Sequence, residues 1–534
     1  MFFERNIVEK NPLKVNIRFA SVYPNLYRTA MSSLGYQIIY GMVNEREDTW
    51  CERVIYPNTR SIESNSPLRD FDIVSFTIQY EEDYFNVLEI LKKSKIPLRK
   101  EDRDDSHPLI IAGGPSPSAN PLPISDFIDV FIVGEAEAIL NKFLDCYQEV
   151  KNPKKELNSF LDIKGVYIYD NPVKRAIVKD MSKAYHISQP IVTETDNPDY
   201  IPVFGNSILL NVSRGCNRGC RFCMSGYTCR PQRETPLKQL IKIAKTAREN
   251  TDIKKVSLIA PAVSDYYKID ELTKKLLDLD FQVSTSSLRV ESTSQDTLEN
   301  LRESGLKTIT IAPESIYTLR KSLNKHMTNE KIEELIKTAI ELNFNIKMYF
   351  LIGLLNEEKK DIKELAEYMK EINGLKSKYS NLNKDSNSKT KDSNSKANKK
   401  QNQIKFSVNP LIPKAHTPLQ WEGYNLKDIR SKERFLKKEL KNLNIKFNSS
   451  KMGLIQYVLS CKGREIGELI EKTTNNRLLP NENKDTLNLN QWKKFTNGYI
   501  EEGNLIDDLP WKNIDNGVDI EFLKKERSKM TKNH

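Results

Sequence analysis

The sequence predicts an α/β protein with two α/β domains in series and an α-rich C-terminal region. Across residues 15–150, short apolar runs alternate with helical patterns, which is typical of an open, Rossmann-like parallel sheet. From residue 207 six strand–helix units follow, which predicts a partial, six-stranded barrel of the TIM type. The boundaries we predict are 1–145 for the first domain, 146–200 for a connecting segment, 201–425 for the barrel and 426–534 for the C-terminal region.

The strands predicted for the first domain are 15–21, 72–78, 108–112 and 128–133. Glycine-containing turns follow two of them, as Gly113-Gly114 and Gly134-Glu135. In open α/β sheets the ligand crevice lies beyond the carboxyl ends of the strands, and glycine lets the backbone approach a ligand closely. These two turns therefore indicate a binding crevice, although either turn alone is weak evidence.

The barrel strands are expected at 207–212, 255–260, 281–287, 308–313, 346–352 and 404–409. Thr235-Pro236 is a good helix start, and another helix is predicted from Thr328 because apolar residues recur there at helical spacing. Residues 374–402 contain KDSNSK twice and almost no apolar side chains. We expect this insertion, just before the sixth strand, to be disordered.

Charge and cysteine usage restrict the functional class. The net charge is +11, but residues 374–402 contribute +6 of it, so we expect no nucleic-acid partner. The seven cysteines are odd in number and mostly scattered, which argues against a disulfide framework and favours a reducing cytoplasm. We expect no secretory signal in the first residues, which lack an apolar core and a small-residue cleavage site, and no apolar run is long enough to span a membrane.

Cys216, Cys220 and Cys223 lie at C-x3-C-x2-C spacing in one glycine-containing loop after the first barrel strand. Three thiolates in so tight a loop can hold one face of a [4Fe–4S] cluster and leave one iron open. Phe222 would shield that cluster from water. The alternative is a zinc site, which would need a fourth ligand such as Cys229 or a remote histidine.

This spacing, with an aromatic residue before the last cysteine, resembles the radical SAM superfamily. The resemblance implies that S-adenosylmethionine (SAM) binds the open iron of the cluster. By the same resemblance, Glu314 at the end of the fourth strand would contact SAM, and Arg320 would pair with its carboxylate. The competing interpretation of these two residues is a surface ion pair.

Other SAM contacts are predicted at the barrel mouth. Ser286 and Arg289 would touch the ribose or the carboxylate of SAM. Ile352-Gly353 resembles the segment that packs against the adenine through backbone contacts, although Leu355 replaces a proline often found in that turn.

Residues 15–140 resemble the cobalamin-binding domain that precedes the barrel in B12-dependent radical SAM proteins. Gly113, Gly114, Gly134 and Glu135 would then line the cobalamin crevice. No histidine precedes His107, so either the corrin is bound without a histidine ligand or cobalamin is absent. Residues 79–81 could approach the lower face of the cobalt, or could simply cap a strand.

The resemblance extends over nearly the full length, to a largely uncharacterised B12-binding group. It implies reductive cleavage of SAM and hydrogen abstraction from an unactivated carbon, with cobalamin-dependent methylation of a protein side chain or small molecule. A ferredoxin or flavodoxin would supply the electron. Two alternative functions stay open. One is a B12-independent radical enzyme such as a tRNA-modifying methylthiotransferase, and the other is a non-catalytic scaffold. Against the methylthiotransferase, only Cys51 and Cys146 lie upstream of the loop.

Overall fold

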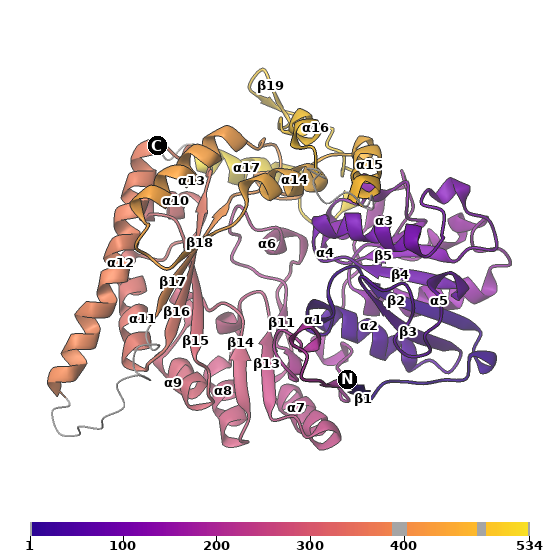
Figure 1. Cartoon of the computed structure of the whole chain (residues 1–534), viewed down its shortest axis with the longest axis horizontal. Helices are drawn as coiled ribbons and strands as arrows, with labels where there is room; N and C mark the ends of the chain where they lie inside the picture. The colour runs from indigo at the N-terminus through magenta and orange to yellow at the C-terminus, as the bar shows by residue number, and fades with distance from the viewer. Residues whose placement is uncertain (1–2, 387–402, 478–486, 532–534) are drawn as a thin grey trace.

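The computed structural model describes residues 3–386, 403–477 and 487–531. Figure 1 shows two α/β lobes side by side, with the N-terminal sheet in one and the barrel strands in the other. Helices of the C-terminal region run along one edge of both lobes. The domain order predicted from the sequence is therefore present, although its boundaries shift as described below.

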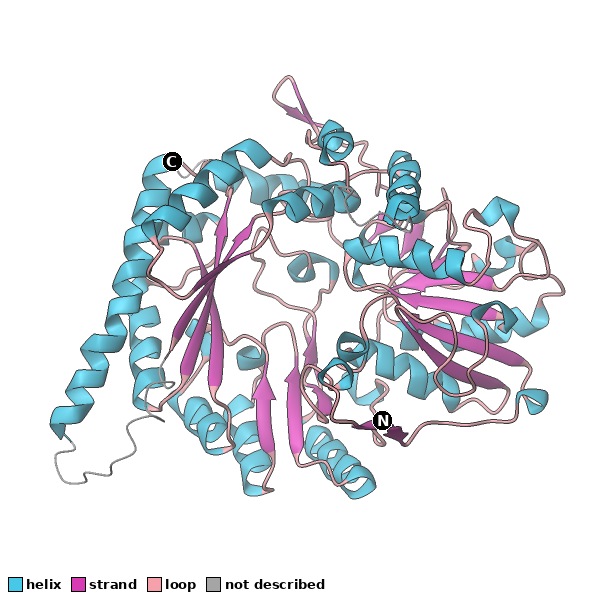
Figure 2. Ribbon diagram, in the orientation of Figure 1, coloured by secondary structure: helices cyan, strands magenta, loops and turns pink. Residues whose placement is uncertain are grey.

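The N-terminal lobe contains a six-stranded sheet in the order β3-β2-β4-β5-β6-β7 (Figure 2). The first five strands are parallel, and β7 pairs antiparallel with β6. Counted along the chain, the parallel part has the order 2-1-3-4-5, which is the flavodoxin-like doubly wound arrangement. The strand bounds are β2 Ile17–Tyr23, β3 Thr49–Ile55, β4 Ile73–Thr77, β5 Leu109–Gly113, β6 Val130–Ile132 and β7 Val166–Tyr167.

Helices cover both faces of this sheet. Strand residues alternate between two apolar cores: one includes residues of α2 and α5, and the other residues of α3 and α4. This alternation is the period-2 pattern of a sheet buried on both sides. The helix bounds are α1 Tyr27–Ala30, α2 Leu34–Asn44, α3 Tyr84–Lys93, α4 Pro115–Ala119 and α5 Leu140–Glu149.

Strand β3 is the one parallel strand of this sheet that the sequence analysis missed. Its middle carries Glu52 and Arg53, so the sequence shows no continuous apolar run there. Both side chains are nevertheless buried. Arg53 forms ion pairs of 2.7 Å with Glu4 and 2.6 Å with Glu63. Glu52 is paired with Arg18. Buried charges are tolerated only when they are paired and hydrogen-bonded, and this network meets that condition.

The connecting segment predicted at 146–200 belongs largely to the sheet lobe. Its residues 166–167 form β7, so the predicted boundary at 145 is too early. Further along this segment, β8 (Val173–Lys174) pairs with β21 (Ile514–Asp515) near the C-terminus. In addition, β9 (Val192–Glu194) pairs with β1 (Phe3–Arg5).

The second lobe is a partial barrel of parallel strands in two hydrogen-bonded sheets, β10-β13-β14 and β15-β16-β17-β18. All six predicted strands are present, and within the described residues β18 (Ile445–Phe447) adds a seventh beside β17. The barrel region therefore extends past the predicted boundary at 425. The other barrel strands are β10 Ile208–Asn211, β13 Lys255–Ile259, β14 Gln282–Thr285, β15 Thr308–Glu314, β16 Asn345–Ile352 and β17 Ile404–Pro410.

Helices α7 to α12 connect these strands. Helix α7 begins at Leu237, directly after Pro236, and α11 begins at Asn329, where the Thr328 side chain caps it, so both predicted helix starts are confirmed within one residue. The helix bounds are α7 Leu237–Thr251, α8 Ile269–Asp278, α9 Gln295–Glu303, α10 Tyr317–Ser322, α11 Asn329–Glu341 and α12 Lys359–Ser386.

The prediction of disorder from residue 374 is wrong for its first part. Helix α12 continues to Ser386, and Leu375 and Tyr379 pack against the apolar core. The Tyr379 hydroxyl donates a 2.6 Å hydrogen bond to Glu333 on α11. Two apolar side chains at i and i+4 are enough to extend the helix along its neighbour. The rest of the predicted insertion, 387–402, lies outside the described residues.

The C-terminal region is mainly helical, as predicted, and connects the two lobes. Helix α15 packs against α3 of the first lobe, and α13 contacts the barrel strand β16. Its elements are α13 Leu426–Glu439, α14 Ser450–Cys461, α15 Gly467–Arg477, α16 Leu489–Trp492, α17 Ile520–Thr531, β19 Ile500–Glu501 and β20 Asn504–Leu505. Among the described residues, no helix combines the length and apolarity needed to cross a bilayer.

A buried carboxyl group lies beyond the carboxyl end of β4. Asp83 is 3% exposed and accepts a 2.7 Å hydrogen bond from Asn25 at Oδ1. Its other oxygen has no hydrogen-bond partner in the described part of the chain. Burial raises the pKa of Asp83 from 3.8 to about 7, with a further contribution from the nearby charge of Glu82.

This raised pKa predicts a pH-dependent stability. The folded state favours the protonated form of Asp83. Protonation of this carboxyl therefore contributes fully to the stability of the fold below about pH 4, and the contribution is lost as the pH rises through about 7. Replacing Asp83 by Asn should therefore stabilise the chain by on the order of 2–4 kcal/mol more at about pH 8 than at about pH 4. Urea unfolding of both proteins at the two pH values measures the difference. The exposed Asp102→Asn change serves as the control, and an equal effect of Asp83→Asn at both pH values would contradict the assignment.

Candidate functional site

The loop that carries the three cysteines is closed at its base. It leaves the barrel after β10, and β11 (Ser213–Arg214) pairs antiparallel with β12 (Arg233–Glu234) on the return. The two arms touch at Gly215, where a Cβ atom would lie 2.3 Å from the Cys229 carbonyl oxygen. Gly215 has a φ of 78°, so both sterics and backbone conformation require glycine. The short helix α6 (Ser225–Thr228) follows Cys223.

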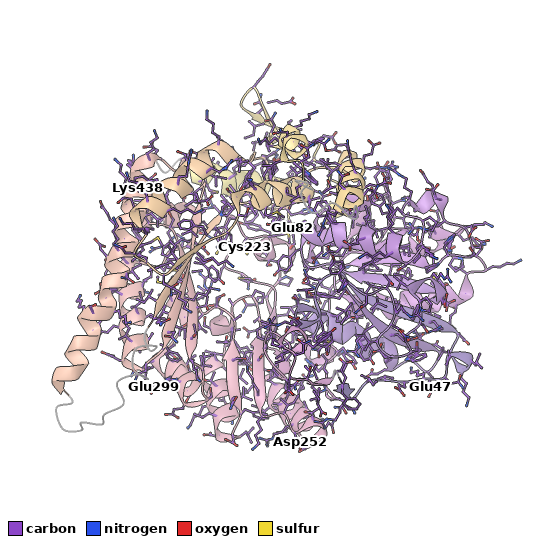
Figure 3. The ribbon with its side chains drawn as sticks, viewed as in Figure 1. Glu47, Glu82, Cys223, Asp252, Glu299 and Lys438 are labelled. Atoms are coloured by element: carbon purple, nitrogen blue, oxygen red, sulfur yellow. The ribbon has the colours of Figure 1, made fainter. Side chains whose placement is uncertain are left out.

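The three predicted cluster ligands lie together in this loop. Cys220 is buried, while Cys216 and Cys223 are partly exposed. Burial raises the pKa of Cys216, and it raises the pKa of Cys223 to about 11 with the charges of Cys220 and Cys216 adding to the effect. Each thiol therefore lies within electrostatic reach of another. Figure 3 marks Cys223 between the barrel strands and the N-terminal sheet.

The donor set fits an iron–sulfur cluster better than a zinc ion. Among the described residues, no group of three His, Cys, Asp or Glu side chains is arranged to hold a single metal ion. Cys229, the suggested fourth zinc ligand, lines a cavity beside the N-terminal sheet that none of the other three cysteines lines. Three thiols that share one loop suit a polynuclear centre with an open corner, whereas structural zinc sites use four protein ligands.

Two cations approach this trio. Arg289 Nη1 lies 3.9 Å from Cys220 Sγ. Lys325 Nζ lies 5.8 Å from the centre of the Phe222 ring, and its charge opposes the rise in the pKa of Cys223. Positive groups at this distance favour thiolate ligands and an anionic centre.

The cysteine loop is braced by arginines against the barrel rim and the C-terminal region. Arg218 forms a bidentate ion pair of 2.6 and 2.8 Å with Asp265, which follows β13. Arg221 donates a 2.6 Å hydrogen bond to the Ser322 carbonyl and forms a 3.0 Å ion pair with Glu526 of α17. Such paired contacts fix orientation as well as contributing energy.

The base of the loop is joined to the N-terminal sheet through Glu135. Its carboxylate pairs with Arg233 at 2.7 Å and with Arg214 at 3.3 Å, which belong to the two strands of the loop base. Burial would raise the pKa of Glu135, but hydrogen bonding to Arg233 and the charge of Arg214 keep it below its usual value. Arg214 also pairs with Glu137 at 2.7 Å.

Two predicted residues lie at the carboxyl rim of the barrel. Ser286 is exposed just past β14, and Glu314 ends β15 with a φ of 69°. A positive φ is uncommon for glutamate and marks a strained position, as is frequent in functional sites. Glu314 forms a 2.7 Å ion pair with Lys325. The predicted contacts of Ser286, Arg289 and Glu314 with SAM remain predictions.

Arg320 has a different environment from the one expected. Its side chain is fully buried, and its guanidinium donates to the carbonyls of Pro313, Ser315 and Met327 and to the Asn329 amide oxygen. These contacts hold the turn after β15 together. Four of its five N–H groups are engaged within the protein, and the predicted pairing of Arg320 with the carboxylate of SAM stays a prediction.

The backbone at Ile352-Gly353 is also engaged. The Gly353 N–H donates a 2.6 Å hydrogen bond to Glu357, and the Ile352 carbonyl accepts one of 2.8 Å from Leu411. Gly353 has a φ of 83°. This conformation explains the glycine, and the predicted adenine contact stays a prediction.

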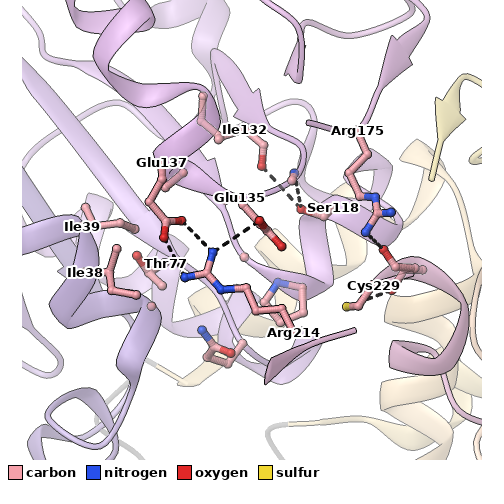
Figure 4. Close-up of a pocket in the computed structure, with 18 of the residues that line it drawn as sticks. Ile38, Ile39, Thr77, Ser118, Ile132, Glu135, Glu137, Arg175, Arg214 and Cys229 are labelled. Carbon is pink, nitrogen blue, oxygen red and sulfur yellow. Dashed lines mark hydrogen bonds and ion pairs between the residues drawn. The ribbon is translucent and has the colours of Figure 1, made fainter. Parts of the chain in front are cut away.

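A cavity of about 290 Å³ lies between the N-terminal sheet and the cysteine loop (Figure 4). Its lining combines the carboxyl ends of β4, β5 and β6 with the start of α2 and residues 224–229. Gly113, Gly114, Gly134 and Glu135 all line it, so the sequence predicted the position of a crevice at this edge.

The glycines of this crevice serve internal packing. A Cβ atom would lie 2.3 Å from the Ile78 oxygen at Gly114 and 2.0 Å from the Ala176 oxygen at Gly134. At Gly113 it would lie 3.3 Å from the Ile132 oxygen. The sequence analysis attributed these glycines to close approach of a ligand, but neighbouring backbone already accounts for them.

Sequence reasoning missed several residues of the site. Lys325, Asp265 and Glu526 lie about 50 to 300 positions from the cysteines along the chain and meet them only in the fold. The signal that could have found the first two is their position shortly after a barrel strand, where chemistry-bearing residues collect. Glu526 lies in a C-terminal helix and carries no comparable signal.

Comparisons with known proteins agree with this geometry. Residues 35–168 match the model for the N-terminal region of radical SAM proteins, and residues 210–369 match the radical SAM superfamily. The second match begins in β10 and includes all three cysteines. MJ0966 of Methanocaldococcus jannaschii, an uncharacterised protein, is 30% identical over 472 residues, which cover 87% of this chain and 93% of that protein.

A solved structure shares the fold. It is the radical S-adenosylmethionine methyltransferase TsrM from Kitasatospora setae with cobalamin and a [4Fe–4S] cluster bound. The match has a TM-score of 0.50 at 11% identity and covers 67% of this chain and 73% of TsrM. Together with the family matches and the three-cysteine loop at the barrel rim, it leads to one conclusion: the chain is a member of the radical SAM superfamily, in the same family as MJ0966.

Proposed function

We propose that the chain cleaves SAM reductively and uses the resulting radical to remove hydrogen from an unactivated carbon. The observation that supports this best is the single loop of three thiols at the carboxyl rim of the barrel, with two cations beside it. When bound, a [4Fe–4S] cluster supplies the electron that splits SAM into methionine and a 5′-deoxyadenosyl radical. A ferredoxin or flavodoxin would be the electron donor.

Residues of the chain would orient SAM in this reaction. Lys325 and Arg289 are the cations near the cysteines, and they would hold the carboxylate of SAM. Glu314 would accept a hydrogen bond from its amino group. The ion pair between Glu314 and Lys325 preorganises both groups, so that neither must be ordered at the moment of binding. Ser286, exposed just past β14, would reach the ribose.

Cobalamin-dependent methylation of a carbon is a second candidate. It is favoured by the flavodoxin-like strand order and by a largely apolar crevice that faces the segment just after Cys223. The crevice does not fit a corrin as it stands, because about 290 Å³ is at the lower limit for a drug-sized ligand and a corrin is larger. The ion pairs of Arg214 with Glu135 and Glu137 also cross it.

A methylthiotransferase and a non-catalytic scaffold both have less support. A methylthiotransferase would need a second cysteine trio, whereas Cys51 is buried in β3 and Cys146 lies on α5. The pKa of Cys51 is raised well above its usual range by burial, as expected for a packing residue. A scaffold would have no use for three thiols placed beside two cations.

The cluster assignment predicts a difference between two cysteine variants. After anaerobic reconstitution with iron and sulfide, Cys220→Ala should lose the cluster and the conversion of SAM to 5′-deoxyadenosine under dithionite. Cys229→Ala should keep both, because Cys229 faces the crevice. Iron analysis and chromatography of the nucleoside products measure this. If the wild type yields no 5′-deoxyadenosine, the non-catalytic scaffold is preferred.

The proposed contact of Lys325 with SAM predicts a difference in SAM affinity between two lysine variants. Lys325→Gln should weaken SAM binding by about tenfold or more, since a hydrogen bond to a charged group contributes about 1.5–3 kcal/mol. Lys321→Gln is the matched control, because Lys321 is exposed on the neighbouring helix α10. Equilibrium binding of SAM to the reconstituted protein gives both values. Equal affinities for the two variants would show that Lys325 does not contact SAM.

A separate experiment tests whether the chain binds cobalamin, as cobalamin-dependent methylation requires. The protein is incubated with hydroxocobalamin and desalted, and its corrin absorption is recorded. Retention of one corrin per chain would support cobalamin-dependent methylation and require the crevice to open. Loss of the absorption would remove that candidate and leave a B12-independent radical enzyme.

A further inference from the structure

A second cavity, much larger than the interdomain crevice, lies in the C-terminal region. Its volume is about 1,210 Å³, and it runs between α13 and the segment 493–500. Figure 1 shows α13 and α16 along the edge of the molecule that lies beyond the carboxyl ends of the barrel strands. We call this cavity the basic groove, after the cations that line it: Lys427, Arg430, Arg434, Lys437 and Lys493.

The cations of the basic groove form a row. Four of them come from α13 at positions i, i+3, i+7 and i+10, so they share one face of the helix over about 15 Å. All four are exposed. Glu433 is the one acidic residue among the lining residues, and it pairs with Lys437. Within the described residues, no ion pair joins Lys427, Arg430 or Arg434 to a carboxylate.

The rest of the groove offers hydrogen-bonding groups and few apolar contacts. Asn425 and Asn497 are exposed in its wall. Of its large apolar lining residues, Trp421, Tyr424 and Leu454 are at most 4% exposed, and Ile500 is 39% exposed. A protein partner gains most of its affinity from several aromatic or aliphatic anchors in apolar pockets, and one exposed isoleucine offers only a small contact of this kind.

We propose that the basic groove binds the sugar–phosphate backbone of a single-stranded nucleic acid. Each nucleotide carries one negative charge whatever its base, so a regular row of cations matches this ligand without any requirement on its sequence. An acidic peptide would need several carboxylates at matching intervals and an apolar anchor. The asparagine amides of the wall would contact sugar hydroxyls or phosphate oxygens.

This inference reverses an expectation drawn from the sequence. The net charge is modest outside residues 374–402, which argued against nucleic acid. The fold, however, places five cationic side chains and one carboxylate around a single groove. The proposal goes beyond the proposed function and does not depend on it, because the groove residues are distinct from the cysteine loop.

The test measures the binding of a short, fluorescently labelled single-stranded RNA, and of the same sequence in DNA, to the full chain over a range of salt concentrations. For single strands, log K falls with log salt by about 0.7 for each neutralised phosphate. We expect a slope near −3 for the wild type. The double variant Arg430→Gln, Arg434→Gln should bind more weakly, with a slope shallower by about 1.4.

The matched control is Lys438→Gln, Lys441→Gln, which removes two exposed cations that do not line the groove, one in the last turn of α13 and one two residues after it. Figure 3 labels Lys438. It should keep the slope of the wild type. A third variant, Cys220→Ala, should bind the oligonucleotide unchanged, which separates this proposal from the radical chemistry.

Three results would overturn the proposal. One is the absence of binding to either oligonucleotide at low salt. Another is the same change of slope in the control as in the Arg430, Arg434 variant. The third is binding of labelled polyglutamate as tightly as RNA with the same dependence on Arg430 and Arg434, which would identify an acidic protein as the partner.

Discussion

The site depends on how the cysteine loop is held, and the contact that does most to fix it is the pairing of Glu135 with two arginines. Arg214 and Arg233 lie on the two strands that close the loop, and both reach the same carboxylate at the carboxyl end of the N-terminal sheet. The carboxylate is only 18% exposed, so its pairing with both arginines fixes the orientation of the two strands at the base of the loop. This contact therefore joins the cysteine loop to the N-terminal sheet.

The same arrangement defines what lies on each side of the loop. On one side Cys216, Cys220 and Cys223 lie near Arg289 and Lys325, at the rim where the barrel strands end. On the other side α6 and Cys229 face the crevice of the N-terminal sheet. A ligand in the crevice would therefore be separated from the cysteines by a few residues of one loop.

Much of this arrangement could be predicted from the sequence. Apolar runs of regular spacing predicted six barrel strands and four of the five parallel strands of the first sheet, because packing of apolar side chains dominates those positions. The cysteine trio followed from local spacing alone. Strand β3 was missed because Arg53 and Glu52 are compensated only by partners distant in sequence, such as Glu4 and Arg18. The seventh barrel strand, with three residues, gives too short a pattern to detect.

The residues around the cysteines were harder to predict, because their partners are also distant in sequence. Arg320 was chosen as a SAM carboxylate partner by residue type and position, and its guanidinium donates to carbonyls of the turn after β15. Lys325, five residues later, pairs with Glu314. Likewise the glycines of the crevice satisfy backbone packing. Residue type limits what a side chain can do, and only the fold shows which partner it meets.

The central claim is that three thiolates hold a [4Fe–4S] cluster whose fourth iron is open to SAM. Electron paramagnetic resonance of the reduced, reconstituted protein tests it most directly. The account predicts the signal of a reduced [4Fe–4S] cluster that shifts when SAM is added, because SAM becomes a ligand of the open iron. A protein that forms no cluster, or a cluster signal that SAM leaves unchanged, would contradict it.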